Sequence, residues 1–449
     1  MTLQRWQPGE VLGGFTLGEL IHAGGMGAIF RVTKPGLTFP AVMKLPQLGA
    51  PQAGEAIVAF QTEVMIAPTL RGPHVPKFVA AGDLASTPYL VMEWVEGECL
   101  EDVCRRAPLP ASELAQVGAV LADALHAIHL QQVIHLDFKP SNVILRADGS
   151  AVLIDFGFAH HAGLADLLAE QTRFRAGSAP YVSPEQLLGS RQDIRSDLFA
   201  LGVTLYELST GKLPFGEPDS DVRNRFWIDP VPPVALAPEL PPWAQEVILR
   251  AIEPRAELRY QSAAHVAFDL RNPEQITLTD RATKQTNAGL LSHMGRFLRA
   301  HAEFSARLRE PEPLLSRTPT VLVAVDTENL ADERHAAIRA ETSQILAQST
   351  EFRLMCLSVI TPCLASLDHL VRLREWVEPL GVPTERVSLH AIESASPSDA
   401  IVQIARHNNV DRIVIGAPRA GGRAWANSTA SSVTANAGCS VHVVRVPKP

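Results

Sequence analysis

The sequence predicts two folded units of different class: a two-lobed α+β unit over residues 11–272 and an α/β unit with a parallel sheet over residues 319–447. In the first unit a β-rich stretch is followed by a helical one, which is typical of two lobes with a cleft between them. In the second unit strands and helices alternate, which favours a parallel sheet. A chain of 449 residues has room for two such cores and a linker.

Apolar alternation and turn residues set the expected elements of the first unit. The Pro35-Gly36 turn separates two of its early strands, and Ser112 is the predicted N-cap of a long helix. The stretch over 184–272 is mostly helical and is broken by a proline-rich segment over 230–242. The expected strands are 11–20, 28–33, 41–45, 77–80, 89–92, 143–145 and 152–154, and the expected helices include 53–71, 113–131 and 198–210.

Residues 273–318 form the expected linker, in which basic residues recur and the hydrophobic order weakens. Part of this segment has apolar residues at helical spacing, so an amphipathic helix is expected there. Packing on a neighbouring domain and contact with an acidic membrane are the two interpretations. The apolar residues are Leu290, Leu291, Met294, Phe297 and Leu298.

The second unit alternates apolar strands with helical stretches, and we expect all of its strands to be parallel. The expected strands are 321–325, 353–360, 387–392, 412–415 and 440–446, and the expected helices are 331–348, 364–380, 397–407 and 428–436.

Composition excludes several classes of protein. The formal net charge of −8 gives no whole-chain reason to expect nucleic-acid binding. Five cysteines at wide spacing indicate free thiols in a reducing compartment and disfavour a zinc site. The first twenty residues do not read as a signal peptide, and no stretch approaches the roughly 20 apolar residues that span a bilayer. We therefore expect a cytoplasmic protein without a membrane span.

Two short segments carry the groups that phosphoryl transfer needs. Asp137 and Asp155 lie eighteen positions apart, the second directly after an apolar strand. Asp137 suits the carboxylate that accepts a substrate hydroxyl proton, and Lys139 suits the charge on the transferred group. Asn142 and Asp155 offer the hard oxygen donors that Mg²⁺ prefers.

The segments 135–142 and 155–157 resemble the catalytic loop and the metal-binding Asp-Phe-Gly motif of protein kinases. The Asp-x-Lys-Pro-x-Asn form of the first segment resembles the serine/threonine class. The resemblance covers about residues 11–272. It implies the two-lobed protein kinase fold, ATP and Mg²⁺ as cofactors, and serine or threonine hydroxyls of proteins as substrates.

The resemblance extends to a nucleotide site. Lys44 matches the lysine that pairs with the α- and β-phosphates, and Glu63 lies nineteen residues later in an expected helix. The segment 21–29 resembles the glycine-rich loop, although His22 stands where the first glycine is expected. The segment 92–97 resembles the hinge between lobes. The implied ATP-binding residues are Ile21, His22, Ala23, Gly24, Gly25, Met26, Gly27, Ile29, Ala41, Lys44, Glu63, Met92, Glu93 and Val95.

The segment 177–185 resembles the end of a kinase activation segment, with Ser183 in place of the usual alanine. The resemblance implies that Glu185 pairs with Arg259 and that Asp197 braces the catalytic loop. Leu136 departs from the family, because many members have an arginine there that anchors a phosphorylated loop. We hypothesise that activity does not require a phosphate on Thr172, or that another part of the chain controls it.

The second unit resembles the universal stress protein domain, which is Rossmann-like, over about 319–447. In nucleotide-binding members a glycine loop and a later Gly-Ser hold phosphates at a helix N-terminus. Arg419 and Asn427 depart from that pattern. Nucleotide binding and a docking or homodimerisation role without a ligand are the two interpretations. The candidate contacts are Asp326, Gly416, Gly421 and Ser428.

The sequence therefore predicts an ATP-dependent serine/threonine protein kinase in stress or regulatory signalling. A pseudokinase is the first alternative, on the grounds of His22 and Leu136, but the motif residues are present. A small-molecule kinase is the second, and the long segment 158–178 disfavours it, because such a segment would form a platform for a peptide.

Overall fold

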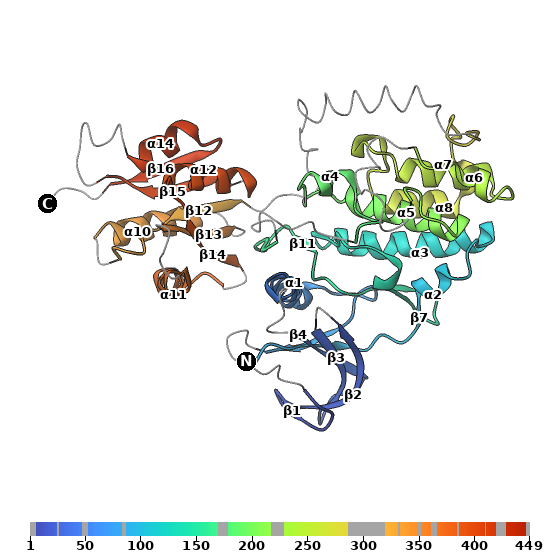
Figure 1. The fold of residues 1–449 in the computed structure, drawn as a ribbon, viewed down its shortest axis with the longest axis horizontal. Helices are drawn as coiled ribbons and strands as arrows, with labels where there is room; N and C mark the ends of the chain where they lie inside the picture. Colours follow the sequence, from blue (N-terminus) through green and yellow to red (C-terminus); the bar gives the residue numbers. More distant parts are fainter. Residues whose placement is uncertain are drawn as a thin grey trace. The chain divides into compact units, whose positions relative to one another are not determined.

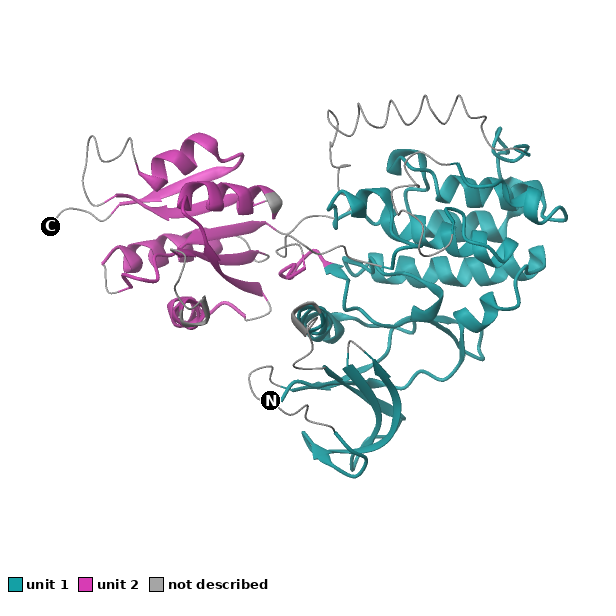
Figure 2. Cartoon of the chain, viewed as in Figure 1, with its two compact units in different colours: residues 1–160, 173–315 teal, residues 161–172, 316–449 magenta. Residues whose placement is uncertain are grey.

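The computed structural model describes residues 6–24, 27–46, 53–82, 87–168, 178–216, 229–285, 319–330, 333–348, 352–360, 366–383, 386–408, 410–418 and 428–445. The chain forms two compact units (Figure 2), one of residues 1–160 and 173–315 and one of residues 161–172 and 316–449. Several predicted features lie outside the described residues: Gly25, Met26, Thr172, Arg419, Gly421, Asn427 and the apolar stripe over 290–298.

The first unit begins with a six-stranded antiparallel sheet in the order β1-β2-β3-β4-β6-β5 (Figure 1). Its core is a cluster of apolar side chains that includes Phe15, Phe30 and Met43. The helix α1 (Ala53–Ile66) follows β4 in the chain. The strands are β1 (Val11–Leu12), β2 (Phe15–Gly24), β3 (Gly27–Thr33), β4 (Ala41–Pro46), β5 (Phe78–Ala81) and β6 (Leu90–Glu93).

The rest of the first unit is mainly helical, with short strands around the catalytic loop. The two longest of these helices, α3 and α5, each bury mainly apolar side chains. The elements are β7 (Glu98–Cys99), α2 (Leu100–Cys104), α3 (Ala111–His129), β8 (Val133–Ile134), η2 (Pro140–Asn142), β9 (Val143–Leu145), β10 (Ala151–Leu153), β11 (His160–His161), α4 (Pro184–Leu187), α5 (Arg195–Thr210), α6 (Pro233–Leu236), α7 (Pro242–Ala251), η4 (Ala256–Leu258), α8 (Ala263–Arg271) and η5 (Pro273–Gln275).

Three expected boundaries in this unit are wrong. The strand expected over 11–20 is two strands, because Gly13 and Gly14 have φ of +57° and +80° and form the two-residue turn of a hairpin. Ser112 lies inside the first turn of α3, and Pro110 is the N-cap without a side-chain hydrogen bond. Asp197 lies within the first turn of α5 rather than before it.

The second unit contains a five-stranded sheet, all parallel, in the order β14-β13-β12-β15-β16. The predicted parallel α/β architecture is confirmed. Because β13 and β15 flank β12, the chain leaves the central strand in opposite directions, which creates a switch point. The elements are β12 (Thr320–Ala324), α10 (Arg334–Leu346), β13 (Arg353–Ile360), α11 (Ser366–Val377), η6 (Glu378–Leu380), β14 (Val387–Glu393), α12 (Pro397–His407), β15 (Arg412–Gly416), α14 (Thr429–Asn436) and β16 (Ser440–Val444).

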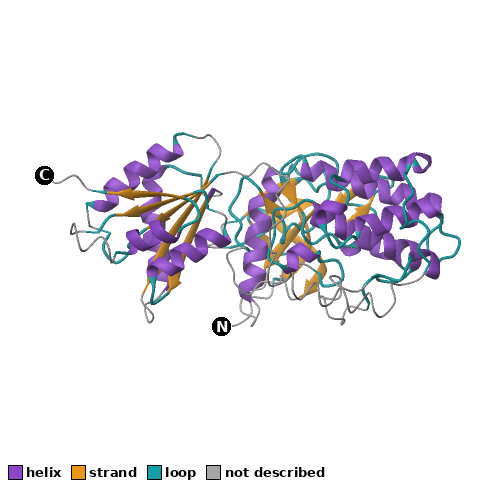
Figure 3. Ribbon diagram, turned by 90° about the horizontal axis from the view of Figure 1, so that it is seen from above, coloured by secondary structure: helices purple, strands orange, loops and turns teal. Residues whose placement is uncertain are grey.

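Helices cover both faces of this sheet (Figure 3). Val321 and Val323 of β12 pack with Ile338 of α10 and Trp376 of α11 on one face. Leu322, between them, packs on the other face with residues of α12 and α14. Successive side chains of the strand point to opposite faces and contribute to two apolar layers, one on each face, as expected for a buried parallel sheet.

Across the described residues, none of the helices combines the length and the apolar character that a bilayer crossing requires.

Candidate active site

The first group of site residues centres on the Lys44 ammonium. Lys44 extends from β4, Glu63 from α1, and Asp155 follows β10. Lys44 Nζ lies 2.6 Å from Glu63 Oε2 and 3.0 Å from Asp155 Oδ1. Three residues that are up to 111 positions apart in the chain therefore meet at one point. The predicted pairing of Lys44 with Glu63 is confirmed.

Burial and mutual charge shift the pKa values of this triad. Burial favours the neutral amine, but the carboxylates of Asp155 and Glu63 outweigh it and raise the pKa of Lys44. Burial raises the pKa of Glu63 against the opposing charge of Lys44, and the Asp155 carboxylate adds to that rise. Burial also acts to raise the pKa of Asp155, yet the charge and hydrogen bond of Lys44 hold it below its ordinary value. Lys44 and Asp155 are therefore both charged at neutral pH.

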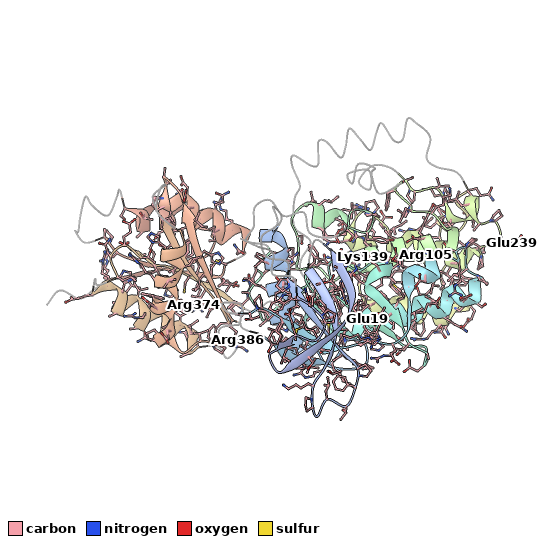
Figure 4. The ribbon with its side chains drawn as sticks, turned by 60° about the horizontal axis from the view of Figure 1, so that its bottom comes forward. Glu19, Arg105, Lys139, Glu239, Arg374 and Arg386 are labelled. Atoms are coloured by element: carbon pink, nitrogen blue, oxygen red, sulfur yellow. The ribbon has the colours of Figure 1, made fainter. Side chains whose placement is uncertain are left out.

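The second group lies on the catalytic loop and around η2. The Asp137 carboxylate is nearly buried, with 3% of its side chain exposed, and lies 2.9 Å from Lys139 Nζ. Asn142 Nδ2 donates to Asp137 Oδ2 at 3.1 Å and to the Asp137 carbonyl oxygen at 2.9 Å. Lys139, labelled in Figure 4, also donates to Ser178 Oγ at 2.6 Å. The loop thus holds an amine, an amide and a carboxylate in fixed positions.

The backbone of this loop is held by buried Asp197. Its carboxylate accepts from the backbone N–H of His135 at 2.8 Å and of Leu136 at 2.9 Å, and it lies 2.9 Å from His129 Nε2. Leu136 has φ of +59°, a region that costs energy for any residue except glycine. Gln186 Nε2 donates to the Leu136 carbonyl oxygen at 2.7 Å and fixes its other side. The predicted bracing role of Asp197 is confirmed.

The two groups are joined through the ring of His135, which is fully buried. Its Nε2 lies 3.1 Å from the carbonyl oxygen of Ile154. The ring also packs at 5.0 Å from the Phe156 ring and at 6.5 Å from the Phe138 ring. Asp155, between Ile154 and Phe156, has φ of +65°. Each turn that carries a carboxylate thus contains a residue in the left-handed region, Leu136 in one and Asp155 in the other.

The glycine-rich segment is the hairpin of β2 and β3. His22 pairs with Ile29 across this hairpin, and Gly24 pairs with Gly27. A Cβ on Gly24 would lie 2.9 Å from His22 Nε2, so the imidazole that replaces the first glycine lies against the backbone of Gly24. Gly27 has φ of +137°, and its Cβ would lie 2.0 Å from the carbonyl oxygen of Leu45. Gly27 is therefore required by the contact with β4.

The expected hinge follows β6. Ala41 is the partner of Glu93 in the β4–β6 ladder, and buried Val95 follows two residues later. The Glu93 carboxylate is held by Arg146 Nη2 at 2.8 Å. The remaining expected ATP contacts lie on the same sheet: Ile21, His22, Ala23 and Gly24 on β2, Gly27 and Ile29 on β3, Lys44 on β4, and Met92 on β6.

The end of the activation segment is fixed to the helical lobe. Ser183 is the N-cap of α4, and its side chain accepts from the Gln186 N–H. Arg259 donates to Glu185 from Nη1 at 2.7 Å and from Nη2 at 2.9 Å. Ser196 Oγ adds a hydrogen bond of 2.7 Å to Glu185. The predicted Glu185–Arg259 pair is confirmed, and the serine in place of alanine has a structural reason.

Sequence reasoning missed three residues of this site. Ser178 contacts Lys139 through its hydroxyl, and its N–H donates to Asp137 Oδ1 at 2.7 Å. Gln186 and Arg146 hold the catalytic loop and the hinge. Ser178 could have been identified from its position next to Gly177 in the activation-segment motif. Gln186 and Arg146 could not, because nothing in the sequence around them indicates a role in the site.

The second unit has a cavity of about 260 Å³ at the carboxyl ends of its central strands. Asp326 and Gly416 line it together with Arg334 and apolar side chains of β13 and α12. The Asp326 carboxylate accepts from the Glu328 N–H at 3.1 Å and from Asn329 Nδ2 at 2.9 Å. Ser428 caps α14 by accepting from the Ser431 N–H at 3.1 Å. The structure therefore brings Asp326 and Gly416 together.

Comparisons with known proteins match two different families to two separate parts of the chain. The family model for the protein kinase domain matches residues 15–266, and that for the universal stress protein family matches residues 318–445. The serine/threonine-protein kinase PknB of Mycobacterium tuberculosis is 31% identical over 270 residues, which are 59% of this chain and 43% of the relative. A protein of Streptomyces coelicolor named "Probable serine/threonine-protein kinase" is 30% identical over 272 residues, 59% of this chain and 40% of the relative.

The chain thus spans less than half the length of these curated relatives. Among solved structures, the kinase domain of Mycobacterium tuberculosis PknI covers 60% of this chain and 99% of its own length, at 24% identity and a TM-score of 0.46.

Proposed function

The chain belongs to the protein kinase family, and from this premise we propose that it is an ATP-dependent serine/threonine protein kinase. One observation carries the proposal: Lys44 meets both Glu63 and Asp155, while the catalytic loop presents Asp137 beside Lys139 and Asn142. This set supplies a cation for phosphates, a proton acceptor and oxygen donors for a metal. Its completeness argues against a pseudokinase.

In this proposal Asp137 accepts the proton of the substrate hydroxyl and orients its oxygen. Lys139, 2.9 Å from Asp137, stabilises the negative charge that develops on the transferred group. Ser178 keeps both side chains in place through its two contacts. Lys44 holds the α- and β-phosphates of ATP, and Glu63 keeps the lysine extended toward them. The hinge backbone at Glu93 and Val95 meets the adenine edge.

The residues present fit a magnesium ion. Asp155 carries a charged carboxylate on a side chain that is 29% exposed, and Lys44 Nζ contacts its Oδ1. The Asn142 amide nitrogen is engaged with Asp137, which directs the amide oxygen away from that carboxylate. Two hard oxygen donors of this kind suit Mg²⁺, which neutralises phosphate charge when bound.

The test is phosphorylation of a generic protein substrate with labelled ATP and Mg²⁺. We expect Asp137→Asn and Lys44→Met to lower kcat by at least about a hundredfold, because each removes a group that acts in the transition state. Matched controls are Asp123→Asn and Lys212→Met, which change residues of the same types away from the site. Loss of activity in the controls, or full activity in the first two, would contradict the assignment.

The second unit supports a second candidate function, the binding of a nucleotide. The cavity of about 260 Å³ at the switch point favours a ligand over a purely docking role. In this proposal Asp326 and Gly416 contact the ligand, and Ser428 acts at the N-terminus of α14. Gly421 belongs to the same proposal from the sequence alone.

Other features of the protein stay predictions from the sequence. We infer protein substrates, a role in stress or regulatory signalling, a cytoplasmic location and a homodimer through the second unit. The domain limits 11–272 and 319–447 belong to the same proposal, with 273–318 between them.

A further inference from the structure

The segment that follows η5 docks on the helical lobe of the first unit. We call residues 276–285 the strap. Its backbone carbonyl oxygens at Arg281, Ala282 and Lys284 lie 2.8, 3.3 and 2.9 Å from the amide nitrogen of Gln245 on α7. Gln245 is fully buried, and its Oε1 accepts from the Val234 N–H at 3.0 Å. One side chain therefore links the strap to the start of α6.

The next residue of α7, Glu246, faces a threonine of the strap. Glu246 is a buried residue, 2% exposed, and its carboxylate accepts from the Thr279 N–H at 2.9 Å. Thr279 Oγ1 lies 2.8 Å from one carboxylate oxygen and 2.9 Å from the other. Arg281 lies 3.5 Å from Glu246. In the part of the chain that the structure describes, the hydrogen bonds and ion pairs of the Glu246 carboxylate all come from the strap.

Two further ion pairs hold the C-terminal half of the strap. Lys284 Nζ lies 2.9 Å from Asp229 Oδ2, and Arg281 Nη2 lies 3.4 Å from Glu253 Oε2. Only Ala282 of the strap is a buried apolar residue. Because the strap is held by polar contacts and a single small apolar side chain, its local opening exposes little apolar surface and needs less free energy than global unfolding.

Resting on the proposed kinase function, we propose that Thr279 is a phosphorylation site and that its phosphate releases the strap from α7. The residue is exposed, so a kinase reaches it in the open strap. Once modified, its phosphate oxygens would stand where the hydroxyl now meets the Glu246 carboxylate. A group of about −2 charge beside a buried carboxylate repels it, and the hydroxyl hydrogen bond is lost. Arg281 then pairs with the phosphate in the open state.

The modifying enzyme in this proposal is a second copy of the chain. Thr279 Oγ1 forms a bond to the γ-phosphorus of ATP, and the bond from that phosphorus to the β,γ-bridging oxygen breaks. ADP leaves with the electron pair of that bond. The hydroxyl proton passes to Asp137 of the acting copy and then to solvent.

The first experiment maps phosphates by mass spectrometry after the full chain is incubated with ATP and Mg²⁺. The substrate is the full-length Asp137→Asn chain, mixed with a catalytic amount of the unmodified chain, and casein reports general activity in parallel. Phosphate on Thr279 of the Asp137→Asn chain supports the proposal. Casein phosphorylation without phosphate at Thr279 overturns it and leaves the kinase function standing, whereas absence of both counts against the kinase function itself.

The second experiment tests release without any catalysis, by hydrogen exchange of the full chain. We expect Thr279→Glu to speed exchange of the strap amides and of the Val234 amide by about tenfold, because it places a charge beside Glu246. Thr277→Glu is the matched control, since it adds the same charge two residues away on an exposed position. Addition of Glu246→Gln to Thr279→Glu should return exchange to that of Glu246→Gln alone. Equal exchange in the Thr279→Glu and Thr277→Glu chains would overturn the proposal.

Discussion

The Glu185–Arg259 pair shows how one buried residue makes stability depend on pH. Arg259 is fully buried, and besides Glu185 it donates to the carbonyl oxygens of Glu253, Pro254 and Arg195. Burial acts to raise the pKa of Glu185, but the Arg259 charge and the hydrogen bonds of Arg259 and Ser196 hold it below its ordinary value. A carboxyl with a lowered pKa stabilises the fold above its unfolded pKa and loses that contribution as pH falls.

We expect Glu185→Gln to lower the free energy of unfolding of the first unit by about 3–5 kcal/mol, because it leaves a buried guanidinium without its charge partner. The variant should also lose less stability than the unmodified chain between about pH 5 and pH 3. Urea denaturation at several pH values measures both. Asp123→Asn, in the exposed ion pair with Arg271, is the control and should cost about 1 kcal/mol or less. Similar losses for both variants would contradict the buried-pair argument.

Leu136 and Ser178 together bear on regulation at the residue scale. Leu136 packs with Ile134 and Ile194 in an apolar cluster, where the family often has a phosphate-binding arginine. Ser178 already ties the activation segment to Asp137 and Lys139 without a phosphate. We therefore expect the Ser178 contacts to take the place of the usual phosphate anchor.

From this we expect Thr172→Ala to keep kcat/KM within about threefold of the unmodified chain, since no arginine precedes Asp137 to receive a phosphate. Ser178→Ala should lower it by about tenfold, because Lys139 loses its hydroxyl partner. Initial rates with a generic protein substrate measure both variants. A Thr172→Ala chain with negligible activity would show that loop phosphorylation is required after all.

At the scale of elements, the contact of β3 with β4 depends on Gly27. Its Cβ position is 2.0 Å from the Leu45 carbonyl oxygen, so any larger residue must push the strands apart. Ile29 and Lys44 are partners in the same ladder. A change at Gly27 should therefore reach the nucleotide site.

We expect Gly27→Ala to destabilise the first unit by more than about 2 kcal/mol and to raise KM for ATP, because of the clash and the positive φ. Gly36→Ala is the control: its φ is +84°, and a Cβ there would have no atom within 4 Å. It should cost about 1 kcal/mol from backbone strain alone and leave KM unchanged. Thermal unfolding and ATP titration of initial rates check both, and equal effects would refute the contact argument.

Local pattern predicted most elements, but some features of the site could not be read from it. Periodicity located α12 at Pro397–His407 and β13 at Arg353–Ile360, because strong apolar patterns and flanking turns agree there. Lys44, Glu63 and Asp155 were found through motif spacing. Arg146, Gln186 and the strap were missed, since their roles come from tertiary contacts of residue types that occur everywhere. The prediction of Ser112 as an N-cap was wrong, because cap preferences rank residue types but do not locate the residue at which a helix begins.

At the scale of the whole molecule, two sites of different construction lie in one chain. The first joins Lys44 of β4 to the loops that carry Asp137 and Asp155, and the second is the cavity lined by Asp326 and Gly416 in a Rossmann-like unit. If both bind nucleotide, substitutions at one should remove one class of binding and spare the other, because the residues of each site come from a single unit.

We expect photo-crosslinking with an azido-ATP to label peptides from both units of the full chain. Asp326→Ala and Gly416→Leu should lower labelling of residues 319–445 by at least about tenfold, since one removes a polar contact and the other fills the cavity. Labelling of residues 6–285 should not change. Gly438→Leu is the control, because a Cβ there would have no atom within 4 Å. Label confined to the first unit in the unmodified chain would instead favour the docking role of the second unit.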